Sequence, residues 1–144
     1  MSLFATDRVL VPIDFSETSF EALEKTIDFV KDASHLYVIH VLPPLNPGEP
    51  GVMWRTVDSQ TRKSHVEKVL SDRFKEPKYQ GIHVQITIGN PASNIIDYAR
   101  EQAIDLIVIP SHGYTGLKRF VLGSVAERVV RFAHCPVLVL RREV

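Results

Sequence analysis

The sequence has few of the features that mark specialised classes of protein. It contains one cysteine, Cys135, so neither an intrachain disulfide nor a cysteine-based metal cluster can form. Cys135 precedes an apolar run, which favours a half-buried structural thiol over a reactive one. The sequence has no apolar stretch near the roughly 20 residues that span a bilayer. Because the first residues also lack the regions of a signal peptide, we predict a cytoplasmic protein without a membrane partner.

Net charge is also lacking, since 17 basic residues balance 17 acidic ones in a chain of 144 residues. A composition that is 44% hydrophobic and 24% charged excludes a disordered chain and a supercharged nucleic-acid binder. The balance hides an asymmetry: residues 1–34 carry seven acids and three bases, whereas residues 113–144 carry six bases and two acids. A bound anion would explain the basic end, although charge counts alone favour an internally complementary surface. We predict no nucleic-acid partner.

Common phosphate-binding and metal-binding motifs are missing. The first apolar run leads into Pro12-Ile13-Asp14-Phe15-Ser16, which has no glycine, so a dinucleotide-binding G-x-G-x-x-G is excluded there, and no P-loop occurs anywhere. A receiver domain would need several acidic residues at strand ends, and only Asp14 is present. The six histidines lack zinc-ligand spacing, so we predict no metal site built by the protein. Asp14 is either a ligand contact or a cap on its own turn.

Five short apolar runs predict the strands. Most are continuous and β-branched, which is typical of strands covered on both faces in a parallel sheet. The third run alternates apolar and polar residues, so we expect it at a sheet edge. The runs are Val9–Ile13, Leu36–Leu42, Ile82–Ile88, Leu106–Ile109 and Val137–Leu140.

Helical patterns separate these runs. The predicted helices cover 17–32 after the N-cap Ser16, 57–75, a stretch opened by Asn90-Pro91, and 123–133. The alternation of strands and helices predicts a single α/β domain over residues 1–144 with right-handed crossovers. Residues 43–51 hold four of the nine prolines, and we expect a mobile loop over 43–62. The expected buried faces include Val66, Val69 and Leu70 in the second helix and Val125, Val129 and Val130 in the last.

The segment after the fourth strand, residues 110–125, is the richest in candidate binding residues. Its glycines allow a ligand to approach the backbone closely. Gly123-Ser124 then opens a helix, whose first N–H groups suit a phosphate. Ser124 can add a hydroxyl, and Lys118 or Arg119 can add charge. An ordinary glycine-containing turn before a capped helix is the alternative interpretation.

This segment resembles the nucleotide-binding signature of the universal stress protein family, G-x2-G-x9-G-[ST]. Gly113, the nine residues 114–122 and Gly123-Ser124 match its second and third elements, whereas its first glycine is Pro110 here. The resemblance covers essentially the whole chain. It extends to Val11-Pro12-Ile13-Asp14-Phe15-Ser16, His40-Val41, Gly89-Asn90-Pro91-Ala92, Asp105-Leu106-Ile107-Val108 and Cys135-Pro136-Val137-Leu138-Val139.

The resemblance implies an open, twisted five-stranded parallel sheet in the order 3-2-1-4-5 with helices on both faces. This is a Rossmann-like α/β fold of the adenine nucleotide alpha hydrolase-like type. In ATP-binding relatives, the residues that match Asp14 and Val41 hold the adenine, and those that match Pro12 and Ile13 line its pocket. His112 and Gly113 would lie along the ribose and phosphates, while Gly123, Ser124 and Val125 would grip the phosphates.

The function implied is a cytoplasmic stress-response regulator that binds ATP or AMP as a conformational ligand, with Mg²⁺ or Mn²⁺ carried by the phosphates. The alternatives are a slow ATPase or phosphotransferase and a nucleotide-free dimeric interaction module. Pro110 bears on the choice, because proline has no backbone N–H to donate. Relatives dimerise through the last strand, so the resemblance also implies a homodimer joined by antiparallel contact of Val137–Leu140.

Overall fold

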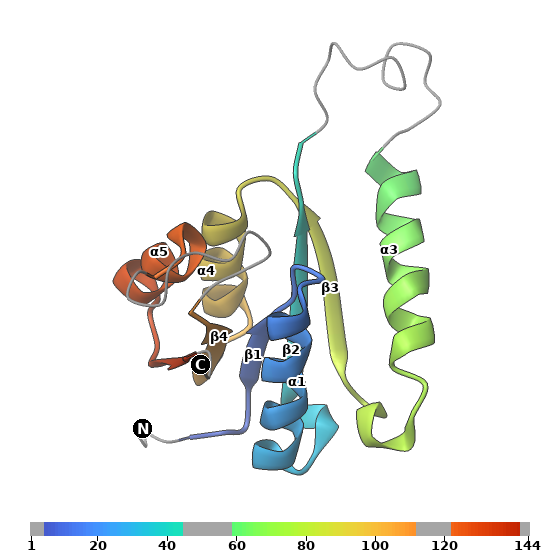
Figure 1. The fold of residues 1–144 in the computed structure, drawn as a ribbon, viewed down its shortest axis with the longest axis horizontal. Coiled ribbons are helices and arrows are strands. Elements are labelled where there is room, and N and C mark those ends of the chain that lie inside the picture. Colours follow the sequence, from blue (N-terminus) through green and yellow to red (C-terminus); the bar gives the residue numbers. More distant parts are fainter. Residues whose placement is uncertain (1–4, 45–58, 112–121, 142–144) are drawn as a thin grey trace.

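The computed structural model describes residues 5–44, 59–111 and 122–141. Their five strands form one parallel sheet in the order β3-β2-β1-β4-β5 (Figure 1). This confirms the predicted strand order and places the alternating third strand at an edge. The strands are β1 (Val9–Pro12), β2 (Leu36–Leu42), β3 (His83–Ile88), β4 (Leu106–Pro110) and β5 (Val137–Leu140).

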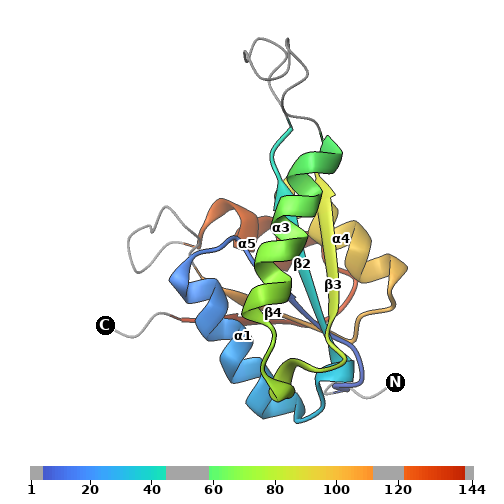
Figure 2. The same ribbon diagram turned by 90° about the vertical axis from the view of Figure 1, so that its right-hand side faces the viewer.

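In the described ranges, four α-helices cover the sheet: α1 (Glu17–Val30), α3 (Ser59–Arg73), α4 (Pro91–Glu101) and α5 (Ser124–Phe132). Figure 2 looks onto the face covered by α1 and α3, and α4 and α5 cover the opposite face. Side chains define two of the helix starts. The Ser16 hydroxyl accepts from the N–H of Ser19 at 3.1 Å, and the Asn90 side chain accepts from the N–H of Ser93 at 3.0 Å.

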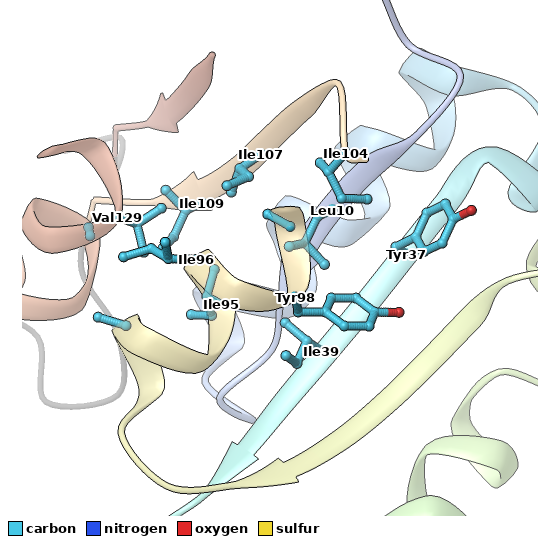
Figure 3. Packing of buried hydrophobic residues seen from close by; sticks show 13 residues of the cluster. Leu10, Tyr37, Ile39, Ile95, Ile96, Tyr98, Ile104, Ile107, Ile109 and Val129 are labelled. Carbon is cyan, nitrogen blue, oxygen red and sulfur yellow. The ribbon is translucent and has the colours of Figure 1, made fainter. Parts of the chain in front are cut away.

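The core lies on both faces of the sheet because successive residues of a strand point to opposite sides. On one face, Leu10, Ile39 and Ile107 pack against α4 and α5; Figure 3 shows Ile95 of α4 among them. On the other face, residues such as Val11 pack beneath α1. Burial on both faces explains why the strands read as continuous apolar runs.

Two expected core positions and one loop boundary were wrong. Val69 is 39% exposed and Val130 is 45% exposed, because Leu70 and Val129 face the sheet and adjacent helical residues diverge by about 100°. Residues 59–62, which we expected in a mobile loop over 43–62, instead form the first turn of α3. Glutamine and arginine in that turn favour a helix, which outweighs its lack of apolar residues. Residues 45–58 lie outside the described part of the chain.

Candidate nucleotide site at the switch point of the sheet

A cavity of about 270 Å³ opens where β1 and β4 end. The paired residues of these two strands are Val9 with Leu106 and Leu10 with Ile107, so the pairing stops well before either carboxyl end. From β1 the chain enters α1 on one face of the sheet, and from β4 it leads to α5 on the other. Ligands of open α/β sheets bind at such a switch point.

Eight of the predicted site residues line this cavity: Pro12, Ile13, Asp14, Val41, Pro110, Gly123, Ser124 and Val125. The fold therefore gathers residues that are up to 113 positions apart in the chain. Their contact with a nucleotide stays a prediction. The other four predicted contacts, His112, Gly113, Lys118 and Arg119, lie outside the described residues.

Six further residues line the cavity and were missed from the sequence: Ser19, Ile39, Pro91, Ile95, Ile109 and Ala126. Ile39 could have been found because residues two apart in a strand share a face, and it lies two residues before Val41. Ser19 could have been found because it lies three residues after Ser16, on the same side of the helix start. Pro91 and Ile95 had no such signal. They come from α4, whose position over the end of the sheet depends on how the crossover packs.

Asp14 lies in a tight turn between β1 and α1. Its Oδ1 accepts from the N–H of Ser16 at 2.9 Å, and the residue also lines the cavity. The two interpretations of Asp14 are thus compatible, because one carboxylate can close its turn and face a ligand. Ser19 is fully buried beside it, and the Ser19 hydroxyl donates to the carbonyl oxygen of Ser16 at 2.8 Å. This commits the hydroxyl hydrogen and leaves the oxygen free to accept.

The start of α5 forms another wall of the cavity. Its N-cap is Gly123, with φ −60° and ψ 156°, and no side chain caps its first turn. In contrast, α1 and α4 each have a capping side chain. The first N–H groups of a helix have no partner within it and carry partial positive charge. The wall formed by Gly123, Ser124 and Val125 is therefore suited to an anion.

Pro110 is the last residue of β4 and lies against the same cavity. The N–H of Ile107 donates to the carbonyl oxygen of Pro136, just before β5, at 3.0 Å, and the N–H of Ser111, just after β4, donates to that of Leu140 at 2.9 Å. By alternation, the nitrogen of Pro110 faces β1. Because the pairing of β1 with β4 ends at Leu10 and Ile107, proline at this position removes no sheet hydrogen bond. The strand accommodates the departure from the glycine signature.

The cavity carries little charge and much apolar surface. Asp14 is the one ionisable residue among its described lining residues. Within residues 5–44, 59–111 and 122–141, no three His, Cys, Asp or Glu side chains gather as a metal cluster would require.

Cys135 lies half-buried outside the cavity, and burial raises the pKa of its thiol. No helix in the described ranges combines the length and apolar character needed to cross a membrane.

These features define an open α/β protein with a cavity at the switch point of its parallel sheet. The universal stress protein family model matches residues 5–141, and the chain belongs to that family. It is 36% identical over 141 residues to universal stress protein MJ0531 of Methanocaldococcus jannaschii, covering 94% of this chain and 82% of that protein. It is 28% identical over 147 residues to YxiE of Bacillus subtilis, covering 94% and 99%.

Solved structures agree with the fold. The structure of MJ0577, from the same archaeon, superposes with a TM-score of 0.72 at 30% identity, over 96% of this chain and 97% of that one. UspA from Lactobacillus plantarum superposes with a TM-score of 0.74 at 24% identity, over 94% and 98%. A universal stress protein in complex with cAMP has a TM-score of 0.66 at 20% identity, over 96% and 100%. The last two likenesses show the fold alone.

Proposed function

We propose that this protein binds an adenine nucleotide, ATP or AMP, as a conformational ligand in a cytoplasmic stress response, with residues 1–144 acting as one domain. One observation carries the proposal. The lining of a largely apolar cavity includes both Asp14 and the first turn of α5, which no side chain caps. A nucleotide has the matching chemistry, since its base is flat and apolar with polar edges and its phosphate is an anion. The related fold solved with cAMP holds a ligand of this class.

In the proposed complex, the base lies between the apolar side chains of Ile13 and Val41, with Asp14 accepting from its amino group. Gly123, Ser124 and Val125 bind the phosphates through backbone N–H groups and the serine hydroxyl. His112 and Gly113 contribute along the ribose, and Lys118 or Arg119 adds positive charge near the phosphates. Mg²⁺ or Mn²⁺ enters with the phosphates of ATP and is held chiefly by them.

We propose further that the protein is a homodimer joined through β5. This strand is at the edge of the sheet, and Leu138 on it is 46% exposed. On α5, which precedes it, Val130 is 45% exposed and Phe132 is 53% exposed. An apolar edge strand in water is a template for pairing, and antiparallel contact with a second copy would cover it.

Calorimetric titration with ATP and AMP, followed by measurement of phosphate release, tests the function. We expect saturable binding of both nucleotides and no phosphate release above background. GTP is the control for recognition of the base. Absence of binding at millimolar nucleotide would contradict the proposal and support the nucleotide-free interaction module. Steady phosphate release that disappears in Asp14→Ala would support the slow ATPase instead, because Asp14 is the one candidate base among the described lining residues.

A further inference from the structure

His40 contacts the residues on both sides of Asp14 from the neighbouring strand. Its Nδ1 lies 2.6 Å from the carbonyl oxygen of Ile13. Because a carbonyl oxygen only accepts, Nδ1 carries the hydrogen and donates it. The imidazole also meets the ring of Phe15 edge to face, with centroids 4.7 Å apart and planes at 84°. His40 itself does not line the cavity, so any effect it has on a ligand there acts through another residue.

The turn that carries Asp14 needs such support. Phe15 has φ +66°, a left-handed conformation that residues with a side chain adopt at a cost and keep only where their surroundings enforce it. Its ring packs against His40 and, at a centroid distance of 5.7 Å, against Phe20. The guanidinium of Arg73 lies 3.6 Å from the centre of the Phe20 ring and covers it. The side chain of Phe15 is therefore held from two directions.

The contact between His40 and Ile13 lies on the backbone that leads into Asp14. The carbonyl of Ile13 and the nitrogen of Asp14 belong to one planar peptide unit, so a hydrogen bond to that carbonyl orients the unit as a whole. The N–H of Ile13 is fixed as well, since it donates to the carbonyl oxygen of Ile39 at 2.8 Å. The backbone leading into Asp14 is thus tied to β2 at two successive groups.

We propose that His40 is a positioning residue that sets the placement of the Asp14 carboxylate and thereby the choice of base. This inference rests on the proposed function. An ionised carboxylate accepts hydrogen bonds and donates none, so it pairs with the 6-amino group of adenine and opposes the 6-oxo group of hypoxanthine. The ratio of affinities for AMP and IMP therefore reports where the carboxylate lies.

The experiment measures the affinities of AMP and IMP in the wild-type chain, His40→Phe and His40→Asn. Phenylalanine keeps an aromatic ring against Phe15 but has no donor, whereas the asparagine Nδ2 can donate from the position of Nδ1. We expect His40→Phe to lower the affinity for AMP about tenfold, which is the effect of one well-placed hydrogen bond. The ratio of the affinities for AMP and IMP should fall by a similar factor. His40→Asn should retain most of the preference. Melting curves of each variant confirm that it is folded.

Each outcome has a defined meaning. If His40→Phe weakens AMP and IMP equally, the residue acts only on general structure and the inference is overturned. An unchanged AMP-to-IMP preference at unchanged affinity overturns it as well. If His40→Phe does not fold, His40→Asn becomes the deciding variant. Loss of the AMP-to-IMP preference in His40→Asn would then overturn the inference, because its donor should preserve that preference. If the wild-type chain binds ATP but not AMP, the same comparison is made with ATP and ITP. Failure of the wild-type chain to bind either ATP or AMP overturns the proposed function, and this inference with it.

Discussion

The backbone N–H of Gly123 donates to the carbonyl oxygen of Ser111 at 2.8 Å, so the connection between β4 and α5 begins and ends at one place. Ser111 is in turn tied to β5, because its N–H donates to the carbonyl oxygen of Leu140 at 2.9 Å. Gly123 lines the cavity at this closure. The candidate contacts Lys118 and Arg119 therefore belong to a connection whose two ends are fixed next to the proposed phosphate site.

Substitution of Gly123 by valine should abolish nucleotide binding without unfolding the protein. The dihedral angles φ −60° and ψ 156° are accessible to any residue, so valine introduces no backbone strain. A side chain at the N-cap lies over the first N–H groups of its helix, which is where we place the phosphate. Calorimetry with ATP should show at least a hundredfold loss of affinity, about 2.7 kcal/mol.

Gly123→Ala is the graded control for this variant, because one methyl group covers less of the helix start and should give a smaller loss. Melting curves of both variants should stay close to that of the wild-type chain. Wild-type affinity in Gly123→Val would show that the phosphate site has been assigned to the wrong place.

Leu138→Lys should convert the proposed dimer to a monomer. The substitution puts a charge on the apolar edge strand β5, where a partner strand would have to bury it. Size-exclusion chromatography with light scattering at micromolar concentration measures the mass. Val84→Lys is the matched control, since Val84 lies on the opposite edge strand β3 and is 39% exposed. A dimer that persists in Leu138→Lys, or a wild-type chain that is monomeric, would refute the β5 interface.

Tyr79→Phe should change the alkaline stability of the protein. Burial, and then the hydrogen bond that the Tyr79 hydroxyl donates to Glu24, raises the pKa of Tyr79 from 10.0 to about 12. A group with a raised pKa stabilises the fold fully below its unfolded pKa, and this stabilisation is lost as the pH rises through the folded pKa. The wild-type free energy of unfolding should thus fall between pH 10 and 12 more steeply than that of Tyr79→Phe.

Urea unfolding at pH 7, 10, 11 and 12 measures this difference. At pH 7 the variant should be less stable by about 1 kcal/mol, the contribution of one hydrogen bond. The Lys78 ammonium, 2.7 Å from Glu24 Oε2, remains in the variant and keeps that carboxylate paired. Identical pH dependence of the two proteins would show that Tyr79 does not titrate differently on unfolding.

Cys135 should react slowly with a thiol reagent in the folded protein. Burial raises the pKa of its thiol, and the nearby carboxylate of Asp105 acts in the same direction, so less thiolate is present at pH 8 than for a free cysteine. The rate of reaction with Ellman's reagent should rise at least tenfold in denaturing guanidinium, and Cys135→Ser should give no signal. Equal rates in the two conditions would contradict the assignment of Cys135 as a structural thiol.

Local patterns predicted the secondary structure closely. Every predicted strand agrees with the observed one to within one residue at each end, because short β-branched runs bounded by turn residues have one favourable conformation in a covered sheet. The start of α1 was also predictable from the local sequence, since the side chain of Ser16 caps the helix. The faces of the helices were less accurate: Val69 and Val130 are apolar yet exposed, and periodicity alone does not say how wide a stripe the sheet covers.

The candidate site also combines features that local sequence predicts with features that it does not. Residue types that suit a nucleotide could be recognised locally, namely Asp14 after a strand and Gly123-Ser124 at a helix start, because these preferences depend on neighbouring residues. The folded chain was needed to show that Pro91 and Ile95 of α4 line the same cavity and that His40 contacts both neighbours of Asp14. Those contacts join elements far apart in the chain, so they depend on how the crossovers pack across the sheet.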